Sequence, residues 1–287
     1  MDTPVLSRKP DDDEIDIFGL THPGKVRPNN QDQFLIAAIH KRADIWGSSL
    51  PPERLGSLTG ERLAAVAMVA DGVGGLAGGE EASATALDVA MQYVTNSTDC
   101  YYRGDAGEQH FIDQLQAAAL RAHEAVLAKR DANGNAVRSA TTLTLWMGVW
   151  PWFYLLQVGD SRYYLYRQGK LTQVSRDQTV AQELVDAGVM SRTAAHSTRL
   201  ANVLSSAIGG DTAAPVVTRV ASEWHNVGLL CSDGLTKHIS DESIAERLRT
   251  MTSSRQVAEQ LLQDALDAGG SDNITIIVGR AIPKEGR

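Results

Sequence analysis

Cysteine is scarce in this chain of 287 residues, which contains only Cys100 and Cys231. Two cysteines cannot form the disulfide framework that stabilises many small secreted domains. Cys231 also lies in an apolar run that we interpret as a buried strand. The cysteine content therefore favours a reducing, cytoplasmic setting.

Long apolar segments are missing as well. The longest, from Leu143 to Val158, is interrupted by Pro151 and is too short for a membrane-spanning helix. The first ten residues lack the apolar centre of a secretory signal peptide. We therefore expect no membrane insertion, and we interpret residues 143–158 as two core strands.

The chain has no excess of positive charge. Its 27 lysines and arginines are outnumbered by 35 aspartates and glutamates, which gives a formal net charge of −8. Such a protein is not expected to bind the nucleic-acid backbone. If it acts on a phosphate group, the positive charge must come from metal ions and a few arginines.

The apolar pattern predicts a mixture of strands and helices, and 43% hydrophobic residues allow a substantial core. Because strands and helices do not alternate regularly, we expect an α+β sandwich of antiparallel sheets. Residues 1–14 are expected to form a flexible acidic tail, and residues 41–62 a long surface loop. Strands are expected near 15–21, 33–39, 63–70, 141–149, 153–158, 162–167, 216–220, 227–231 and 272–281, and helices near 80–94, 108–129 and 177–188 and after Ser191, Ser240 and Ser253.

Three aspartates lie at the ends of expected strands. Asp71 and Asp233 each follow an apolar run and precede a glycine, and Asp272 opens the last strand. A carboxylate at the end of a buried strand is costly unless it pairs with a cation. The three could share a site for a hard ion such as Mg²⁺ or Mn²⁺, which prefers oxygen ligands.

Each of these signals has a simpler interpretation when taken alone. Asp-Gly is a common turn sequence, so Asp71 or Asp233 could be an ordinary turn residue. Asp160, at the junction of two expected strands, could cap a hairpin, and Arg27 could be a solvated loop residue. Only the complete set favours a functional site.

That set resembles the bacterial branch of the metal-dependent PPM (PP2C) protein phosphatases. The resemblance runs in family order over nearly the whole chain. The matching segments are Gly-x-Val-Arg-x-x-Asn-x-Asp (24–32), Val-Ala-Asp-Gly-x-Gly-Gly (69–75), Gly-Glu-x-Ala-Ser (79–83), Ala-Thr-Thr-Leu (140–143), Val-Gly-Asp-Ser-Arg (158–162), Ser-Asp-Gly-Leu (232–235) and Ser-Asp-Asn-Ile-Thr (271–275).

The resemblance implies a four-layer α-β-β-α sandwich over residues 15–283, with a small helical flap at about 177–206 and a return strand over 202–209. It also implies a role for each matching residue. Asp71 would bridge two Mn²⁺ or Mg²⁺ ions, a hydroxide between them would attack the phosphate, and Arg27 would bind the phosphate oxygens. Asp233 and Asp272 would complete the ligands of the first ion. The Gly72 carbonyl would bind the second ion, and Asp32 would contact it through water. Asp160 would bind a third ion.

The sequence departs from the family pattern near this site. Val73 and Leu76 stand where relatives carry histidines, which excludes a histidine general acid at those positions. The family's Asp-His-Ser at the flap is replaced by Asp177-Gln178-Thr179. These changes affect the expected rate and substrate preference more than metal binding.

The implied function is hydrolysis of phosphoserine and phosphothreonine in proteins, reversing a cognate Ser/Thr kinase. The alternative is a catalytically weak relative that acts as a phosphoprotein-binding regulatory module. Because Asp71, Asp233 and Asp272 are all present, the enzyme is favoured. A monomer is expected, and the Thr-His-Pro-Gly-Lys-Val-Arg segment (21–27) looks similar to phosphatases of type VI secretion.

Overall fold

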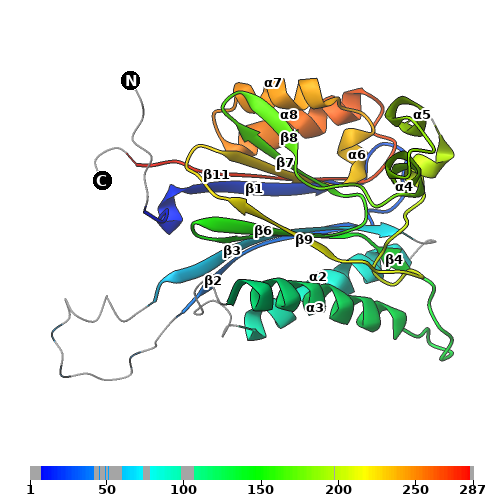
Figure 1. Cartoon of the computed structure of the whole chain (residues 1–287), viewed down its shortest axis with the longest axis horizontal. Helices are drawn as coiled ribbons and strands as arrows, with labels where there is room; N and C mark the ends of the chain where they lie inside the picture. Colours follow the sequence, from blue (N-terminus) through cyan, green and yellow to red (C-terminus); the bar gives the residue numbers. More distant parts are fainter. Residues whose placement is uncertain are drawn as a thin grey trace.

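Two antiparallel sheets pack face to face in this protein, and helices cover the outer face of each (Figure 1). The computed structural model describes residues 8–41, 45, 49, 51, 60–73, 78–97, 107–196 and 198–284. The expected four-layer α+β sandwich is confirmed. Most of the loop expected over 41–62 lies outside the described residues, as do Cys100 and the glycines at 74 and 75.

The first sheet has the strand order β1-β11-β10-β7-β8. Its central strands β10 and β11 are almost continuously apolar, because both of their faces are covered. The strand β8, which the sequence analysis did not predict, forms a hairpin with β7. The bounds are β1 Ile15–His22, β7 Arg162–Arg167, β8 Lys170–Gln173, β10 Val227–Cys231 and β11 Ile274–Ala281.

The second sheet has the order β2-β3-β5-β6-β9, with the short β4 paired to the end of β3. The expected strand over 63–70 is longer in the structure and continues through Asp71 to Val73. The bounds are β2 Asp32–His40, β3 Arg62–Val73, β4 Ala140–Thr141, β5 Leu143–Val149, β6 Trp152–Val158 and β9 Val216–Ala221.

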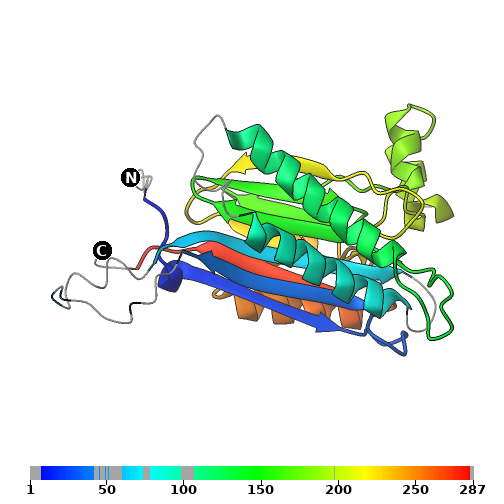
Figure 2. The ribbon, with the colours of Figure 1, turned by 90° about the horizontal axis from the view of Figure 1, so that it is seen from below.

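The helices α2 (Gly78–Asn96) and α3 (Glu108–Leu127) cover the second sheet, and α7 (Asp241–Arg249) and α8 (Ser254–Asp267) cover the first (Figures 1 and 2). The serines that were expected to open α7 and α8 are their N-caps. Ser240 accepts a hydrogen bond from the backbone of Ser243, and Ser253 from that of Gln256.

Three hydrophobic clusters hold the four layers together. One lies between the second sheet and α2 and α3, and another between the first sheet and α7 and α8. The third joins the two sheets and includes Val69, Phe153, Tyr163, Leu230 and Ile277. Burial of these side chains supplies the main driving force for the fold.

The helical flap follows the first hairpin of the first sheet. It contains α4 (Val180–Asp186), α5 (Arg192–His196) and the short 3-10 helix Arg199–Asn202. The helix α4 begins three residues later than predicted, because the Thr179 side chain caps it by accepting a hydrogen bond from Gln182. The return strand expected over 202–209 is not formed; only isolated bridges at Leu204 and Ile208 connect this segment to its neighbours.

Residues 8–14 make specific side-chain contacts. Residues 8–14 do not form a loose tail, because Glu14 is only 2% exposed and accepts two hydrogen bonds from Arg8, at 2.5 and 2.6 Å. Arg62 on β3 also contacts Asp12, at 2.5 Å. Residues 1–7 lie outside the described part of the chain. Within the described part, no helix is both long and apolar enough to cross a bilayer.

Candidate metal centre

Two of the predicted aspartates lie opposite each other in the second sheet. Asp32 is the first residue of β2, and its register partner on β3 is Asp71. The backbone around Asp71 is held by β4 and β5, since the Asp71 carbonyl accepts hydrogen bonds from Thr141 and Thr142, both at 2.9 Å. Strand pairing therefore brings two carboxylates to one edge of the sandwich.

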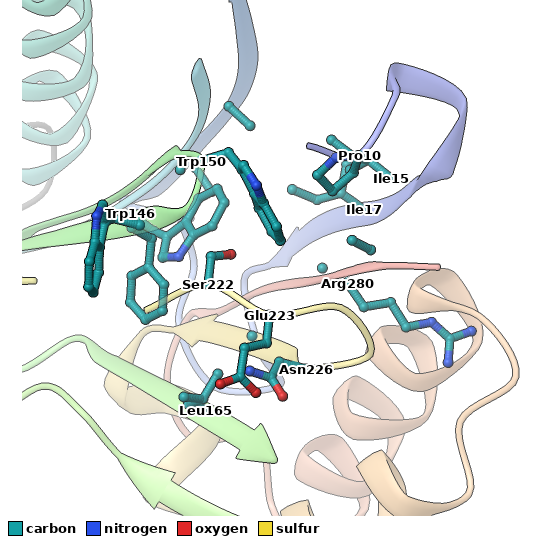
Figure 3. A pocket seen from close by; sticks show the side chains of 18 of the residues that line it. Pro10, Ile15, Ile17, Trp146, Trp150, Leu165, Ser222, Glu223, Asn226 and Arg280 are labelled. Atoms are coloured by element: carbon teal, nitrogen blue, oxygen red, sulfur yellow. The ribbon is translucent and has the colours of Figure 1, made fainter. Parts of the chain in front are cut away.

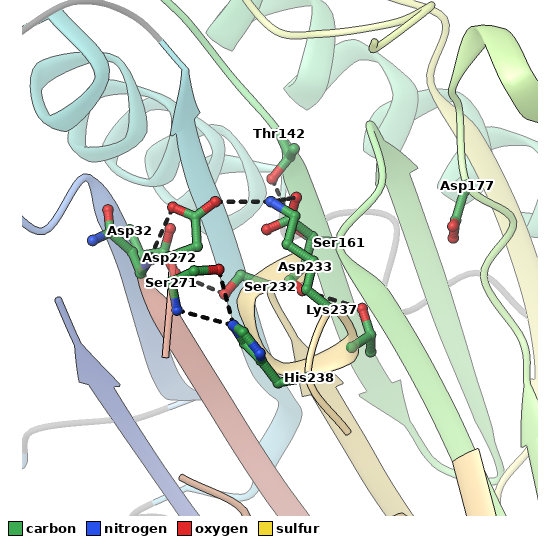
Figure 4. A network of polar contacts seen from close by, with 12 residues as sticks. Asp32, Thr142, Ser161, Asp177, Ser232, Asp233, Lys237, His238, Ser271 and Asp272 are labelled. Atoms are coloured by element: carbon green, nitrogen blue, oxygen red, sulfur yellow. Dashed lines mark hydrogen bonds and ion pairs between the residues drawn. The ribbon is translucent and has the colours of Figure 1, made fainter. Parts of the chain in front are cut away.

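The first sheet brings two further aspartates to the same edge. Asp233 begins the short helix α6 (Asp233–Thr236) after β10, and Asp272 lies two residues before β11. Gly234 allows this arrangement, because a Cβ at that position would lie 1.9 Å from the Asn273 carbonyl oxygen. Asp32, Asp233 and Asp272 gather around one centre in Figure 4.

Asp32 connects the two sheets through hydrogen bonds. Its Oδ2 accepts from the Ser232 and Thr275 hydroxyl groups, both at 2.7 Å. The side chain is 1% exposed, and its Oδ1 has no hydrogen-bond partner among the described residues. The buried Asp233 Oδ1 also has none in that part of the chain. An unpartnered buried carboxylate oxygen is costly and is suited to bind a cation.

Two cationic side chains bind the carboxylates of the first sheet. The Lys237 ammonium lies 2.6 Å from Asp233 Oδ2 and 2.8 Å from Asp272 Oδ2. Arg27 forms a fork on Asp272, with Nε at 2.8 Å from Oδ1 and Nη2 at 3.1 Å from Oδ2. The loop that carries Arg27 rests on residues 270–272, where Lys25 donates a backbone hydrogen bond to Gly270 at 2.7 Å.

The carboxylates perturb one another electrostatically. Burial, followed by the charges of Asp233 and Asp272, raises the pKa of Asp32 to about 6. Burial, followed by the charges of Asp32 and Asp233, raises the pKa of Asp71 well above its ordinary value. Burial also acts to raise the pKa of Asp272, but the bonds and charges of Arg27 and Lys237 lower it overall. The site thus concentrates more negative charge than its own lysine and arginine neutralise.

Asp160 lies at the turn between β6 and β7, where it belongs to the same electrostatic cluster. Burial and the charge of Asp233 raise its pKa to about 7. The turn is bound to the base of the flap, because Gln178 accepts a hydrogen bond from the Gly159 backbone at 2.8 Å and donates one back at 3.1 Å. Asp177 lies apart from Asp32, Asp233 and Asp272 (Figure 4). Arg162 holds it at 2.6 Å, and the charge of Asp177 also contributes to the raised pKa of Asp160.

The chemistry of this cluster fits a hard divalent cation. All the candidate ligands are oxygens, two of those oxygens are buried without partners, and their charges repel one another. No three histidine, cysteine, aspartate or glutamate side chains of the described residues converge in ligand geometry. Asp233 and Asp272 instead share the Lys237 ammonium, which contacts one carboxylate oxygen of each.

Gly72 has a structural role that the sequence analysis did not recognise. A Cβ there would lie 2.3 Å from the Gly79 carbonyl oxygen and 2.6 Å from that of Gln31. The glycine therefore permits β3, α2 and the segment before β2 to approach closely. The metal-binding role expected for its own carbonyl remains a prediction.

Two residues next to Asp233 were missed by the sequence analysis. Lys237 is four residues after Asp233, which is the spacing of an ion pair on one helical turn, so this contact could have been predicted. His238 accepts a hydrogen bond at Nε2 from the Ser271 backbone at 2.9 Å, which fixes the segment before Asp272. That long-range contact has no local sequence signal.

Comparison with known proteins identifies the family. A family model described as protein phosphatase 2C matches residues 55–270, which is more than half of the chain. The chain belongs to the protein phosphatase 2C family. The predicted resemblance to this family is therefore confirmed.

Relatives with a similar sequence or structure are named as serine/threonine phosphatases. PstP of Mycobacterium tuberculosis is 34% identical over 223 residues, which cover 78% of this chain and 41% of that protein. The chain thus spans about two fifths of the length of this relative. The crystal structure of the PstP catalytic domain in complex with two manganese ions has a TM-score of 0.72 and 29% identity, covering 94% of this chain and 99% of that one.

A second solved structure is also similar to this chain. PppA, described as a key regulatory component of the type VI secretion system in Pseudomonas aeruginosa, has a TM-score of 0.68 and 26% identity. The match covers 93% of this chain and 98% of that one. The two structural matches cover 94% and 93% of this chain and so extend over both sheets. The family model covers residues 55–270 and therefore includes Asp71, Asp160 and Asp233 but not Asp32 or Asp272.

Proposed function

We propose that this protein is a metal-dependent phosphatase that hydrolyses phosphoserine and phosphothreonine in proteins. The main support is the cluster of Asp32, Asp71, Asp233 and Asp272 at one edge, with contributions from both sheets. Membership of the phosphatase 2C family and the manganese-bound PstP structure support the same reaction. Two bound Mn²⁺ or Mg²⁺ ions would supply an activated water as the nucleophile and neutralise the charge on the transferring phosphoryl group.

The chain's own residues would divide the remaining work. Asp71, Asp233 and Asp272, with the Gly72 carbonyl, would hold the two ions, and Asp160 a third. Asp32 keeps one carboxylate oxygen fixed by Ser232 and Thr275, so its free Oδ1 is positioned to accept a hydrogen bond from water.

Arg27 would bind the substrate phosphate. Its side chain is 56% exposed, and its planar guanidinium can form two parallel hydrogen bonds to a phosphate group. The fork that it forms on Asp272 supports this role, because Asp272 is one of the candidate metal ligands. Binding of a phosphate would require Arg27 to exchange this carboxylate for the phosphate oxygens.

The expected biological setting also belongs to this proposal. The substrates would be phosphoproteins made by a cognate Ser/Thr kinase, and the protein would act as a monomer in the cytoplasm. The likeness to PppA favours a role beside a type VI secretion system. The flap over 177–206 lies next to Asp160 and would contact the protein part of the substrate.

The test is hydrolysis of a phosphothreonine peptide by the purified protein with Mn²⁺ and with EDTA. We expect turnover only with the metal, and a loss of at least ~100-fold in Asp71→Asn, because that change removes charge from the ion cluster. Asp264→Asn is the matched control, since Asp264 pairs with Arg247 on the outer helices. Binding of the peptide without hydrolysis would instead identify a phosphoprotein-binding module, and the proposed enzyme would be wrong.

A further inference from the structure

A cavity lies between the two sheets, far along the strands from the aspartates. It has a volume of about 130 Å³ (Figure 3). Its wall includes Ala65 near the start of β3, whereas Asp71 lies near the end of that strand. On β11 the order is reversed, because Asp272 precedes the strand and Gly279 near its end lines the cavity. The cavity is therefore separate from the candidate metal centre.

Aromatic side chains form much of the cavity wall. Trp146, Trp150 and Trp152 line it together with Phe153 and Tyr163. Their rings support one another, since the Phe153 ring centroid lies 5.9 Å from that of Trp146 and 5.4 Å from that of Tyr163. Figure 3 shows the Trp146 and Trp150 side chains on the side of the cavity formed by the second sheet. Such a wall favours contact with another flat aromatic ring.

Glycines in the facing strands leave this space open. At Gly148 a Cβ would lie 2.5 Å from the Trp146 ring, and at Gly228 it would lie 2.5 Å from the Tyr163 hydroxyl. At Gly279 it would meet Ile17 at 3.3 Å. The aromatic rings therefore lie against bare backbone. Side chains at these positions would occupy the space between the sheets.

Three of the four charged residues around the cavity are already paired with a residue of opposite charge. Arg62 binds Asp12, Arg280 binds Asp16 at 3.1 Å, and Glu223 binds Arg167 at 2.7 Å. Lys9 donates its ammonium hydrogen bond to the Arg62 carbonyl. In contrast, the buried Nδ2 of Asn226 has no acceptor among the described residues. The indole Nε1 of Trp146 is a second buried donor without a partner in that part of the chain. The largely apolar wall thus disfavours an ion and offers neutral donors.

We propose that this cavity is a binding site for a small uncharged aromatic molecule that carries one hydrogen-bond acceptor, such as an aryl ketone. An apolar cavity of about 150 Å³ in another protein holds a benzene molecule, so a volume of this size suits a single ring. The ring would lie against the tryptophans, and the acceptor would bind the amide of Asn226. This site is independent of the proposed phosphatase reaction.

The first experiment compares three ligands on the intact protein by ¹⁹F NMR titration. The probes are 4-fluoroacetophenone, which is neutral, 4-fluorobenzoate, which is an anion, and 4-fluorobenzylamine, which is a cation. We expect saturable binding of the ketone and at least tenfold weaker binding of both ions, because an ion would lose its hydration without gaining a partner. Absence of saturable ketone binding, or equal binding of all three probes, would overturn the proposal.

The second experiment locates the bound ketone. Ala65→Leu places extra atoms in the cavity and should weaken ketone binding at least tenfold. Ala38→Leu is the matched control, because Ala38 is exposed on β2 opposite Ala65 and does not line the cavity. Asn226→Ala, which leaves the space open, should weaken the ketone severalfold but not 1-ethyl-4-fluorobenzene, which lacks the acceptor. Unchanged ketone binding in Asn226→Ala, or in a folded Ala65→Leu variant, would place the ligand elsewhere.

Discussion

Lys237 occupies a central place among the candidate metal ligands, because its ammonium contacts both Asp233 and Asp272. A divalent cation and this ammonium compete for the same oxygens. We therefore expect Lys237→Met to bind Mn²⁺ more tightly, by about threefold to tenfold given the partial exposure of the pair. Isothermal titration calorimetry with Mn²⁺ measures this directly.

The control for that measurement is Lys284→Met. Lys284 also forms an ion pair with an aspartate, Asp13, at 2.7 Å, but it lies outside the site. Its removal should leave Mn²⁺ affinity unchanged. Weaker Mn²⁺ binding in Lys237→Met would show that the lysine supports the ligands instead of competing for them.

The raised pKa values of the buried carboxylates predict a pH-dependent stability. The pKa of Asp32 is about 6 and that of Asp160 about 7, both above the ordinary value near ~4. The folded state therefore holds these protons more tightly than the unfolded chain. Their stabilising contribution is complete below about pH 4 and is lost as the pH rises towards 7, by up to about 1.4 kcal/mol per pH unit for each proton.

Urea unfolding in EDTA between pH 5 and 7.5 tests this expectation. Over that range Glu14, whose pKa is lowered to about 2 mainly by Arg8, stays ionised and contributes a constant amount. Asp160→Asn should make the loss of stability with rising pH shallower than in the wild type. Equal slopes for the two proteins would mean that Asp160 does not hold its proton in the folded state.

At the scale of elements, the flap is attached to the first sheet through the contact between Arg162 and Asp177. Three hydrogen bonds join the Arg162 guanidinium to this carboxylate, at 2.6 to 3.1 Å, and both side chains are largely buried. Breaking such a pair leaves a buried charge and costs about 3 kcal/mol. Arg162→Met should therefore loosen the flap.

Limited trypsin digestion reports on this attachment, because Arg192 and Arg199 lie within the flap. We expect cleavage after these residues to be severalfold faster in Arg162→Met than in the wild type. Arg247→Met removes an equally well-formed arginine fork on Asp264, at 2.7 Å, but on the outer helices. The two variants should therefore differ, and an equal increase in flap cleavage would indicate general destabilisation.

The elements that were predicted well are those whose signals are local. The apolar run of β10 predicted its bounds, and the serines before α7 and α8 predicted their first residues. The strand β8 was missed because it has four residues, of which only Leu171 is apolar. The prediction of a return strand over 202–209 was wrong. The backbone of this segment forms only isolated bridges, at Leu204 and Ile208, and no continuous pairing with a neighbouring strand.

At the scale of the whole molecule, the candidate site is formed by both sheets. The positions of Asp71, Asp233 and Asp272 at strand ends could be seen in the sequence, and family resemblance suggested that they meet. The contacts that bring them together could not be predicted locally. Gly234 packs against Asn273, and Asp32 of the second sheet binds Ser232 and Thr275 of the first. These contacts depend on the packing of the complete sandwich.

Because the candidate ligands come from both sheets, a bound cation would link the two halves of the fold. A ligand that binds only the folded state at 100 times its Kd stabilises it by about 2.7 kcal/mol. For a domain of roughly this size, that corresponds to an increase in Tm of about 5–10 °C. We therefore expect calorimetry to show such an increase when Mn²⁺ replaces EDTA.

The Asp71→Asn variant should lose most of this increase, since Asp71 and its strand partner Asp32 lie where the second sheet meets the candidate ligands of the first. Asp264→Asn, on α8, should retain it. The comparison also separates metal binding from catalysis, because Tm does not depend on turnover. If Mn²⁺ raised the Tm of Asp71→Asn as much as that of the wild type, the ions would bind elsewhere, and the cluster between the sheets would not be the metal centre.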